Sequence, residues 1–225
     1  MNMPATAQST QSLGSLAVQI PGATAVFRKL KLDFCCGGQQ SLQKACADKQ
    51  LDVDTVLGEI RALQHQQPMP SAPSAAELIE HILGRYHEVH RQQLPELIRM
   101  ARRVEAVHRD HPLVPRGLAD HLETMEQELL EHMAKEEQIL FPLLKQGGHP
   151  MVVHPIGVMR HEHVSHGAQI ERLAALTAQH QPPGDACNTW RALYAGTARL
   201  TEDLIEHIHL ENNLLFPAFE GQAQH

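Results

Sequence analysis

The chain has 225 residues, a net charge of −7, four cysteines and 17 histidines. The acidic balance argues against a nucleic-acid-binding surface, and no apolar stretch reaches the roughly 18–20 residues of a membrane span. The N-terminus lacks a basic segment followed by an apolar core, so no secretory signal is expected. Because two cysteines are adjacent and the chain can bury a core without disulfides, the composition favours the cytoplasm.

Residues 1–11 are predicted to be disordered, and residues 12–66 to form a small helical domain. Short helices are expected on both sides of a Pro-Gly turn, and again over about 42–49 and 53–63. About 50 residues can barely bury an independent core, so this domain is expected to lean on its own bundle or on a second copy of the chain. A homodimer is predicted on that ground.

A tight loop, Asp33-Phe34-Cys35-Cys36-Gly37-Gly38, lies inside this domain. Thiolates bind iron and reduce disulfides or nitrosyls, and the two glycines are expected to leave the thiols accessible. Cys35 and Cys36 are therefore candidates for redox chemistry or iron transfer. The alternative is two small residues in a turn. Cys46 and Cys187 are expected to be buried apolar residues.

Residues 67–73 resemble a Pro-rich linker, and residues 74–225 are predicted to form a bundle. The helical patterns cover about 75–107, 116–145, 152–179 and 185–220. Short links between long helices predict an all-α, antiparallel four-helix bundle. Pro95 is expected to kink the first helix, and Asp185 to cap the last one.

The most informative feature is a repeated phrase on the second and fourth helices. His132-x-x-x-Glu136 and His207-x-x-x-Glu211 lie 75 positions apart, and each is followed by Leu-Phe-Pro. A His and a Glu four residues apart stand on one face of a helix and can reach the same metal ion. The repetition indicates two similar helical hairpins whose His and Glu faces meet in the centre of the bundle.

The first and third helices carry a second repeat, His87-x-x-His90 and His163-x-x-His166, at a spacing of 76. One histidine from each gives a set of four imidazoles and two carboxylates. That set is too large for one tetrahedral zinc and suits two iron ions bridged by the carboxylates. At about 100° per residue, the apolar stripes, which include Val158, favour His90 and His166 as the donors.

Three neighbouring residues have two interpretations each. Glu128, one turn before His132, and Glu162, beside His163, either line a path for protons or iron or are solvated carboxylates. Tyr86 either donates to a bound ligand or, the favoured interpretation, packs in the core.

Together these motifs closely resemble the repair-of-iron-centres proteins, di-iron proteins with a Cys-Cys-Gly-Gly domain and a hemerythrin-like bundle. The resemblance covers about residues 12–220. It rests on Ile20-Pro21, Phe27-Arg28-Lys29, Asp33 to Gly38, Arg85-Tyr86-His87, His90 to Leu97, His132 to Pro142 and Glu211 to Pro217. By this resemblance the ligands are His87, His132, Glu136, His163, His207 and Glu211. It overrides the preference for His90 and His166, which become candidates for holding a ligand or lining a channel.

The resemblance implies a stress-response protein that repairs iron–sulfur clusters damaged by nitrosative or oxidative stress, by supplying iron or removing nitric oxide. Its cofactor is two iron ions per chain, bridged by oxygen and by carboxylates. Its partners are iron–sulfur proteins as clients and nitric oxide or oxygen as small ligands. Two alternatives remain: an enzyme that reduces nitric oxide at a diferrous pair, and a module that binds or senses oxygen or nitric oxide. A carrier needs no Cys-Cys-Gly-Gly domain, which counts against the second.

Overall fold

The computed structural model describes residues 8–64, 73–148 and 150–220. Within these ranges the regular structure is helical, and the β-type pairing is an isolated bridge between Ser12 and Ser41. The predicted all-α class is confirmed. The chain divides into two compact units: residues up to 74 with residues 208–218, and residues 75–207 with those from 219 onward. The predicted linker 67–73 lies almost wholly outside the described residues.

The described part of the first unit contains short helices and the final turns of the last long helix. The short helices are α2 (Leu13–Gln19), α3 (Ala23–Lys29), α4 (Leu42–Asp48) and α5 (Val53–Gln64). Ser12 and Ser41 cap α2 and α4, because each hydroxyl accepts the backbone N–H three residues later. The fully buried side chains of Leu13, Phe27 and Phe34 form the centre of this unit.

This unit begins ahead of the predicted boundary at residue 12. Gln8 is buried, and its side-chain oxygen accepts a hydrogen bond from Arg61 Nε at 2.9 Å. The Gln11 carbonyl accepts the Leu42 N–H at 2.9 Å. Residues 1–7 of the predicted disordered segment lie outside the described part of the chain, but its last residues take part in the packing.

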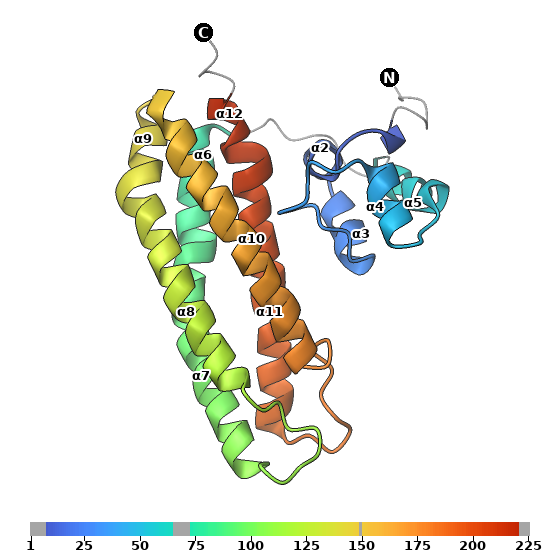
Figure 1. The fold of residues 1–225 in the computed structure, drawn as a ribbon, viewed down its shortest axis with the longest axis vertical. Helices are drawn as coiled ribbons and strands as arrows, with labels where there is room; N and C mark the ends of the chain where they lie inside the picture. The colour runs from blue at the N-terminus through green and yellow to red at the C-terminus, as the bar shows by residue number, and fades with distance from the viewer. Residues whose placement is uncertain (1–7, 65–72, 149, 221–225) are drawn as a thin grey trace. The chain divides into compact units, whose positions relative to one another are not determined.

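The second unit is built on long antiparallel helical rods (Figure 1), and residues 208–218 of the fourth rod belong to the first unit. The first rod is α6 (Ala75–Ile82), η1 (Leu83–His87) and α7 (Glu88–Val107), and the second is α8 (Leu118–Lys135), η2 (Glu136–Leu140) and α9 (Phe141–Lys145). The third is η3 (Pro150–Val152) and α10 (Val153–Leu176), and the fourth is α11 (Asn188–Leu210), continued by η4 (Glu211–Leu215) and α12 (Pro217–Glu220). The predicted four-helix bundle is confirmed. In the described ranges no helix has both the length and the apolarity to cross a bilayer.

The rods are joined by packing and by ion pairs, one of which has a largely buried acid. Helix α8 packs against both α7 and α10. Arg85 in η1 reaches across to α11, where its Nη2 lies 2.5 Å from Oδ1 of the largely buried Asp203. This charge-assisted bond ties the first rod to the fourth at the level of the predicted His ligands.

Two helix ends differ from the sequence prediction. The third helix stops at Leu176 because Ala178, Gln179 and His180 have φ of 47°, 59° and 60°, a left-handed conformation that ends a right-handed helix. The last helix begins at Asn188, so the prediction that Asp185 caps it was wrong. Asp185 instead accepts from His111 Nε2 at 3.2 Å, a bond that connects two loops.

Each of three rods contains one π-helical turn, and each such turn includes one predicted metal ligand: His87 in η1, Glu136 in η2 and Glu211 in η4. In η2 the Phe141 N–H donates to the Glu136 carbonyl five residues back, and Phe216 does the same to Glu211. The next residue is proline in both cases. Proline has no N–H and clashes with the carbonyl four residues back, so the helix widens there. Turns of this kind concentrate at functional sites.

Pro95 lies inside α7, which continues on both sides of it. The widened turn of this rod is η1, which ends eight positions before the proline. The π turn of the first rod therefore lies next to His87, and a kink at Pro95 stays a prediction.

The bundle core can be tested with two leucines of α8. Leu122 is fully buried, whereas Leu130 is 39% exposed. Leu122→Ala should lower the free energy of unfolding by about 2–5 kcal/mol through lost burial and a residual cavity, and Leu130→Ala by roughly 0.5 kcal/mol or less. Urea unfolding followed by fluorescence of Trp190, the single tryptophan of the chain, would report on the bundle. Equal losses in the two variants would contradict the packing described here.

Candidate metal centre

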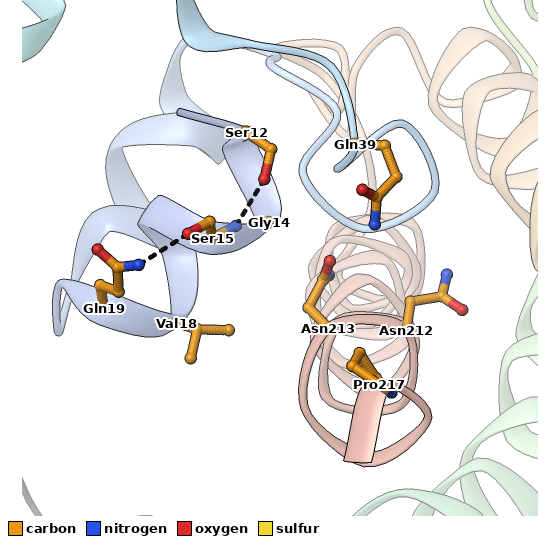
Figure 2. Close-up of a pocket in the computed structure, with 9 residues that line it drawn as sticks. All are labelled: Ser12, Gly14, Ser15, Val18, Gln19, Gln39, Asn212, Asn213 and Pro217. Carbon is orange, nitrogen blue, oxygen red and sulfur yellow. Dashed lines mark hydrogen bonds between the residues drawn. The ribbon is translucent and has the colours of Figure 1, made fainter. Parts of the chain in front are cut away.

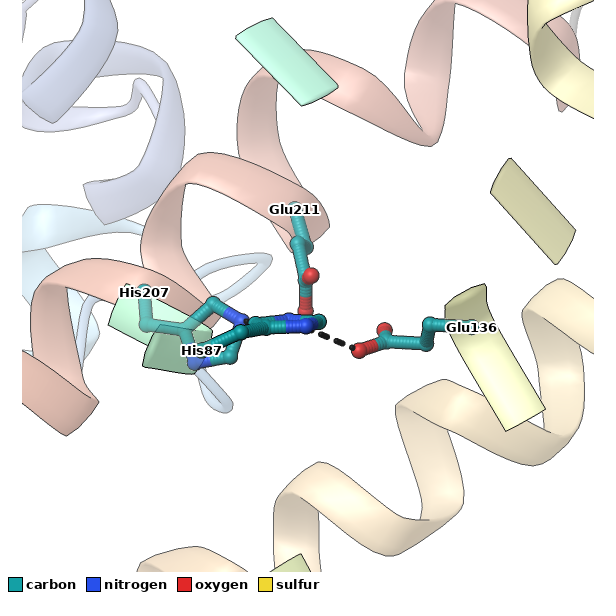
Figure 3. A group of neighbouring side chains, drawn as sticks. All are labelled: His87, Glu136, His207 and Glu211. Atoms are coloured by element: carbon teal, nitrogen blue, oxygen red, sulfur yellow. Dashed lines mark hydrogen bonds and ion pairs between the residues drawn. The ribbon is translucent and has the colours of Figure 1, made fainter. Parts of the chain in front are cut away.

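The rods bring the six predicted ligands into two adjoining groups. One group is His87, Glu136, His207 and Glu211, and the other is His132, Glu136, His163 and Glu211. Within each group the possible ligand atoms lie within 4.8 Å of one another. Figure 3 shows both carboxylates directed toward the rings of the first group. All six residues are at most 1% exposed, and both glutamates belong to both groups.

The Glu136 carboxylate is oriented so that each oxygen serves one group. Oε2 lies 3.4 Å from His87 Nε2, and Oε1 lies 3.4 Å from His132 Nε2. A carboxylate with one oxygen toward each of two nitrogen sites has the geometry of a bridge between two metal ions. This is the arrangement that two similar hairpins predict.

The histidines of each group are paired through their Nε2 atoms. His87 Nε2 and His207 Nε2 are 3.1 Å apart, and His163 Nε2 and His132 Nε2 are 3.2 Å apart. Two nitrogens that bind one ion at roughly 2.1 Å and at a right angle are about 3.0 Å apart. Each pair therefore fits two neighbouring positions on one metal ion, and the donor set of imidazole and carboxylate fits iron.

Carboxylates outside the groups fix the orientation of two of the rings. His87 Nδ1 lies 2.8 Å from Glu137 Oε1, which also accepts from Arg91 Nη2 at 2.7 Å. Burial raises the pKa of Glu137, but the bonds from His87 and Arg91 outweigh burial and leave that pKa lowered. The ionised Glu137 holds the Nδ1 proton of His87, so Nε2 presents its lone pair to the group.

His132 is held in the same way by Glu162. His132 Nδ1 lies 2.9 Å from Glu162 Oε2, and Lys135 Nζ lies 2.6 Å from Glu162 Oε1. Glu162 thus orients a ring, a role that neither sequence interpretation included. The sequence analysis also missed Glu137, Arg91 and Lys135. The sequence could have marked these residues as candidates, since each lies next to a predicted ligand or one helical turn away from it.

Aromatic rings cover the first group. Tyr86 stacks on His207 with centroids 5.5 Å apart and planes 6° apart, and Phe141 stacks on His87 at 5.7 Å. Tyr86 is 5% exposed, which supports the interpretation that it packs in the core. These rings exclude water and hold the imidazoles in place.

His90 and His166 are buried but lie outside both groups. For His90 the periodicity argument failed because η1 contains a π turn, where 100° per residue does not hold. For His166 the stripe was misplaced, since Val158, one of the residues that defined it, is 37% exposed. The structure thus groups His87 and His163, the residues to which the family resemblance pointed.

The two adjacent cysteines lie in a compact loop of the first unit. Their Sγ atoms are 3.6 Å apart, and both are free thiols. The Asp33 carboxylate accepts the N–H groups of Cys36 and Gly37, each at 2.9 Å. The expected accessibility holds for Cys36, which is partly exposed, but Cys35 is buried. The neighbouring Cys36 thiol, burial and the Asp33 carboxylate raise the pKa of Cys35 well above its ordinary value.

The remaining cysteines differ from each other. Cys46 is buried, as predicted. Cys187 is exposed, so that prediction was wrong. It lies just ahead of α11 with Sγ 3.2 Å from His108 Nε2, and a residue at a helix start is not covered by the apolar face of that helix.

The cysteine loop is attached to the η4 turn of the same unit. Asn212 Nδ2 donates to the Cys35 carbonyl at 2.9 Å, and Asn213 Nδ2 donates to the Phe34 carbonyl at 3.0 Å. A Cβ at Gly38 would collide with the Phe34 carbonyl oxygen and lie 3.0 Å from Asn213 Oδ1. Gly38 therefore permits the close turn of the loop back on Phe34 and its approach to the asparagine, whereas the sequence analysis had credited it with opening the loop.

The same asparagines border a pocket of about 260 Å³ in the first unit (Figure 2). Its other walls are Ser12, Gly14, Ser15, Val18, Gln19, Gln39 and Pro217. Neither Cys35 nor Cys36 lines it. The pocket is therefore separate from the thiols. Asn212 and Asn213 connect the two features, because they line the pocket and also bond the backbone of the cysteine loop.

Four antiparallel rods around two histidine and glutamate groups define a metal-binding bundle of the hemerythrin type. Residues 78–219 match the family described as "Hemerythrin HHE cation binding domain", and residues 9–64 match a "Domain of Unknown function (DUF542)". Curated proteins named iron-sulfur cluster repair protein YtfE are similar along nearly the whole chain. The protein from Musicola paradisiaca is 50% identical over 95% of this chain and 98% of its own length, and that from Escherichia coli O81 is 50% identical over 92% and 95%. The chain belongs to this family of iron–sulfur cluster repair proteins, as the sequence motifs predicted.

Removal of Glu136 tests whether the two groups share it. Glu136→Ala should lower metal content from about two ions per chain to below one, because both groups lose an oxygen. His87→Ala removes a donor from one group and should leave about one ion. Glu131→Ala, an exposed position on the same rod, serves as the control. Elemental analysis of loaded protein gives the content, and equal losses for Glu136→Ala and His87→Ala would contradict a shared carboxylate.

The anchor of the cysteine loop can be tested by thiol labelling. Because the thiolate is the nucleophile and the pKa of Cys35 is raised, alkylation of Cys35 should still be increasing at pH 9, the ordinary thiol pKa. Asn212→Ala removes the donor to the Cys35 carbonyl and should make its alkylation severalfold faster. Asn188→Ala, exposed on α11, should change nothing. The rates are read by mass spectrometry of labelled peptides, and an unchanged Cys35 rate in Asn212→Ala would rule out the anchoring role.

Proposed function

We propose that the two groups bind two iron ions, bridged by Glu136, Glu211 and an oxygen atom. The observation that carries this proposal is that both carboxylates belong to both groups. Two cations close together repel each other, and two buried carboxylates and an oxygen bridge reduce that repulsion. Two imidazole nitrogens and two carboxylate oxygens would hold each ion, and the ion would then have positions for small ligands such as nitric oxide or oxygen.

The function that fits this centre is repair of iron–sulfur clusters damaged by nitrosative or oxidative stress. When bound, the iron pair supplies iron for incomplete clusters and electrons for the removal of nitric oxide. The relatives' printed name, iron-sulfur cluster repair protein, supports this assignment, and client iron–sulfur proteins are the partners it requires. The two domains, 12–66 and 74–225 joined by 67–73, would divide the work between thiols and metal.

The residues of the chain have distinct roles in this proposal. The four histidines and two glutamates hold the metal. Glu137 and Glu162 keep the Nδ1 protons of His87 and His132, so both Nε2 atoms remain free to bind. Cys36 is the partly exposed thiol and is the group that meets a client. It would either pass iron on or, by forming a disulfide with Cys35, whose Sγ is 3.6 Å away, release two electrons and two protons to a damaged cluster.

A second candidate is reduction of nitric oxide as an enzymatic activity. In the balanced reaction two nitric oxide molecules, two protons and two electrons give one nitrous oxide and one water, and a pair of ferrous ions held by the two groups would supply the two electrons. The observation that favours it is the adjacency of the groups, since a bond between two nitrogen atoms requires both molecules to be held side by side.

We place this activity in the cytoplasm, because all four cysteines are free thiols and a reducing compartment keeps thiols in that state. The homodimer remains a prediction, which light scattering of the purified protein would decide.

The repair function is tested with a client whose [4Fe–4S] cluster has been damaged by nitric oxide. Iron-loaded protein should restore client activity severalfold better than free ferrous iron at the same concentration, because binding delivers iron at the damaged site. Cys36→Ser should lower this recovery, while Cys187→Ser, at the other exposed thiol, should not.

Gas analysis of the same mixtures separates the two candidate functions. Recovery without nitrous oxide supports iron supply alone, and nitrous oxide without recovery supports the reductase. A recovery no better than that with free iron would reject the repair function.

A further inference from the structure

The cysteine loop of the first unit contains a third group of side chains with the composition of a metal site. Asp33, Cys35 and Cys36 each offer a ligand atom, and these three atoms lie within 4.8 Å of one another. The group shares no residue with the two groups of the bundle, and two of its three donors are sulfur. Sulfur donors favour softer cations than imidazoles and carboxylates do, so this group differs from the bundle centre in its chemistry.

The spacing of the three atoms fits one tetrahedral ion. Cys35 Sγ lies 3.6 Å from Cys36 Sγ and 3.4 Å from Asp33 Oδ1. Around a tetrahedral ion with metal–sulfur bonds of about 2.3 Å and metal–oxygen bonds of about 2.0 Å, two sulfurs are about 3.8 Å apart, and a sulfur and an oxygen are about 3.5 Å apart. The donors of the loop therefore need to move very little to bind an ion.

The Asp33 carboxylate is fixed by the backbone of the loop. Oδ1 accepts the Cys36 N–H and Oδ2 accepts the Gly37 N–H, each at 2.9 Å. A Cβ at Gly37 would lie 2.9 Å from Oδ2, so the glycine lets the carboxylate come this close. Oδ1 also accepts the thiol proton of Cys35. The lone pair that does so becomes available to a cation when this proton leaves.

The group is accessible from one side and supported from the other. Asp33 is exposed and Cys36 is partly exposed, whereas Cys35 is buried. Asn212 Nδ2 holds the Cys35 carbonyl at 2.9 Å, so the loop has its shape before an ion binds. An ion with these three ligands would have its fourth tetrahedral position open to water or to a donor from another molecule.

We propose that Asp33, Cys35 and Cys36 bind one divalent cation, Zn²⁺ or Fe²⁺, at a site separate from the bundle centre. Binding replaces two S–H bonds by two metal–sulfur bonds and releases two protons to water. The bound ion would keep the two sulfurs from forming a disulfide, so it would control the redox chemistry of the loop. The inference rests neither on the two-iron centre nor on the repair function.

The test uses cobalt(II) as a probe, added anaerobically to the full-length protein after the bundle has been loaded with iron. A thiolate-to-cobalt charge-transfer band should saturate at one cobalt per chain, because the bundle groups contain no sulfur. Cys35→Ser and Cys36→Ser should each weaken cobalt binding at least about tenfold. Cys187→Ser, at the other exposed thiol, should leave it unchanged. Asp33→Asn should weaken binding but keep the band, since both sulfurs remain.

Competition identifies the ion, and alkylation gives a second readout. Bleaching of the cobalt band by Zn²⁺ alone assigns the site to zinc, and bleaching by Fe²⁺ at similar concentrations assigns it to iron. Either ion should slow alkylation of Cys36 at least about tenfold, because a metal-bound thiolate is a poor nucleophile. Alkylation of Cys187 in the same sample should keep its rate and serves as the internal control.

Several results would overturn the proposal. They are the absence of the band at saturating cobalt, its persistence in Cys35→Ser or Cys36→Ser, and an alkylation rate of Cys36 that neither ion changes. An unchanged cobalt affinity in Asp33→Asn would reject the carboxylate as a ligand and with it the three-donor site. If Asp33→Asn loses helical circular dichroism, the two serine variants decide, because serine is close to cysteine in size. None of these measurements involves a client, so a failure here leaves the repair function standing.

Discussion

The site depends on two carboxylates that are fully buried and still positioned to bind metal. An ionised carboxylate removed from water is costly unless opposite charge compensates it. Glu136 and Glu211 are fully buried, and each belongs to two groups of ligands. Two such negative charges in the middle of a bundle are stable when cations lie between them. The shared glutamates therefore explain why the rods converge here, and why His87 and His132 turn the Nε2 lone pair toward them.

Helix geometry adjusts to this requirement at the ligands themselves. The Leu-Phe-Pro step after each H-x-x-x-E motif gives Phe141 and Phe216 a bond to the glutamate carbonyl five residues back. A π turn gives up regular hydrogen-bond geometry, and packing of a buried aromatic ring next to it offsets that cost. The proline that follows each motif, Pro142 or Pro217, thus changes the helix in the turn before it, and this widened turn contains the metal-binding glutamate.

The fold was largely predictable because long amphipathic helices, Pro-Gly breaks and a duplicated motif all indicate the same bundle. The ligands on the second and fourth rods followed from spacing alone. The choice between His87 and His90 did not, because no propensity rule announces the π turn of η1. Adjacency to a predicted ligand marks Glu137 and Glu162 as candidates, but it does not say which histidine each one holds. Each bonds a histidine on a different rod, and the relative rotation of rods is set by packing over the whole bundle. The left-handed conformation of Ala178, Gln179 and His180 could not be predicted either, because none of these residues is a glycine.

The η4 turn joins two parts of the chemistry. It contains Glu211, shared by both metal groups, and Asn212 and Asn213, which hold the carbonyls of the cysteine loop. Consecutive Cα atoms are about 3.8 Å apart and linked by a planar peptide, so a substitution that moves one of these side chains disturbs its neighbour. A change in thiol reactivity in an Asn212 variant therefore reports on the loop only if its metal content is unchanged, and a Glu211 variant has to be examined for thiol reactivity as well as for metal.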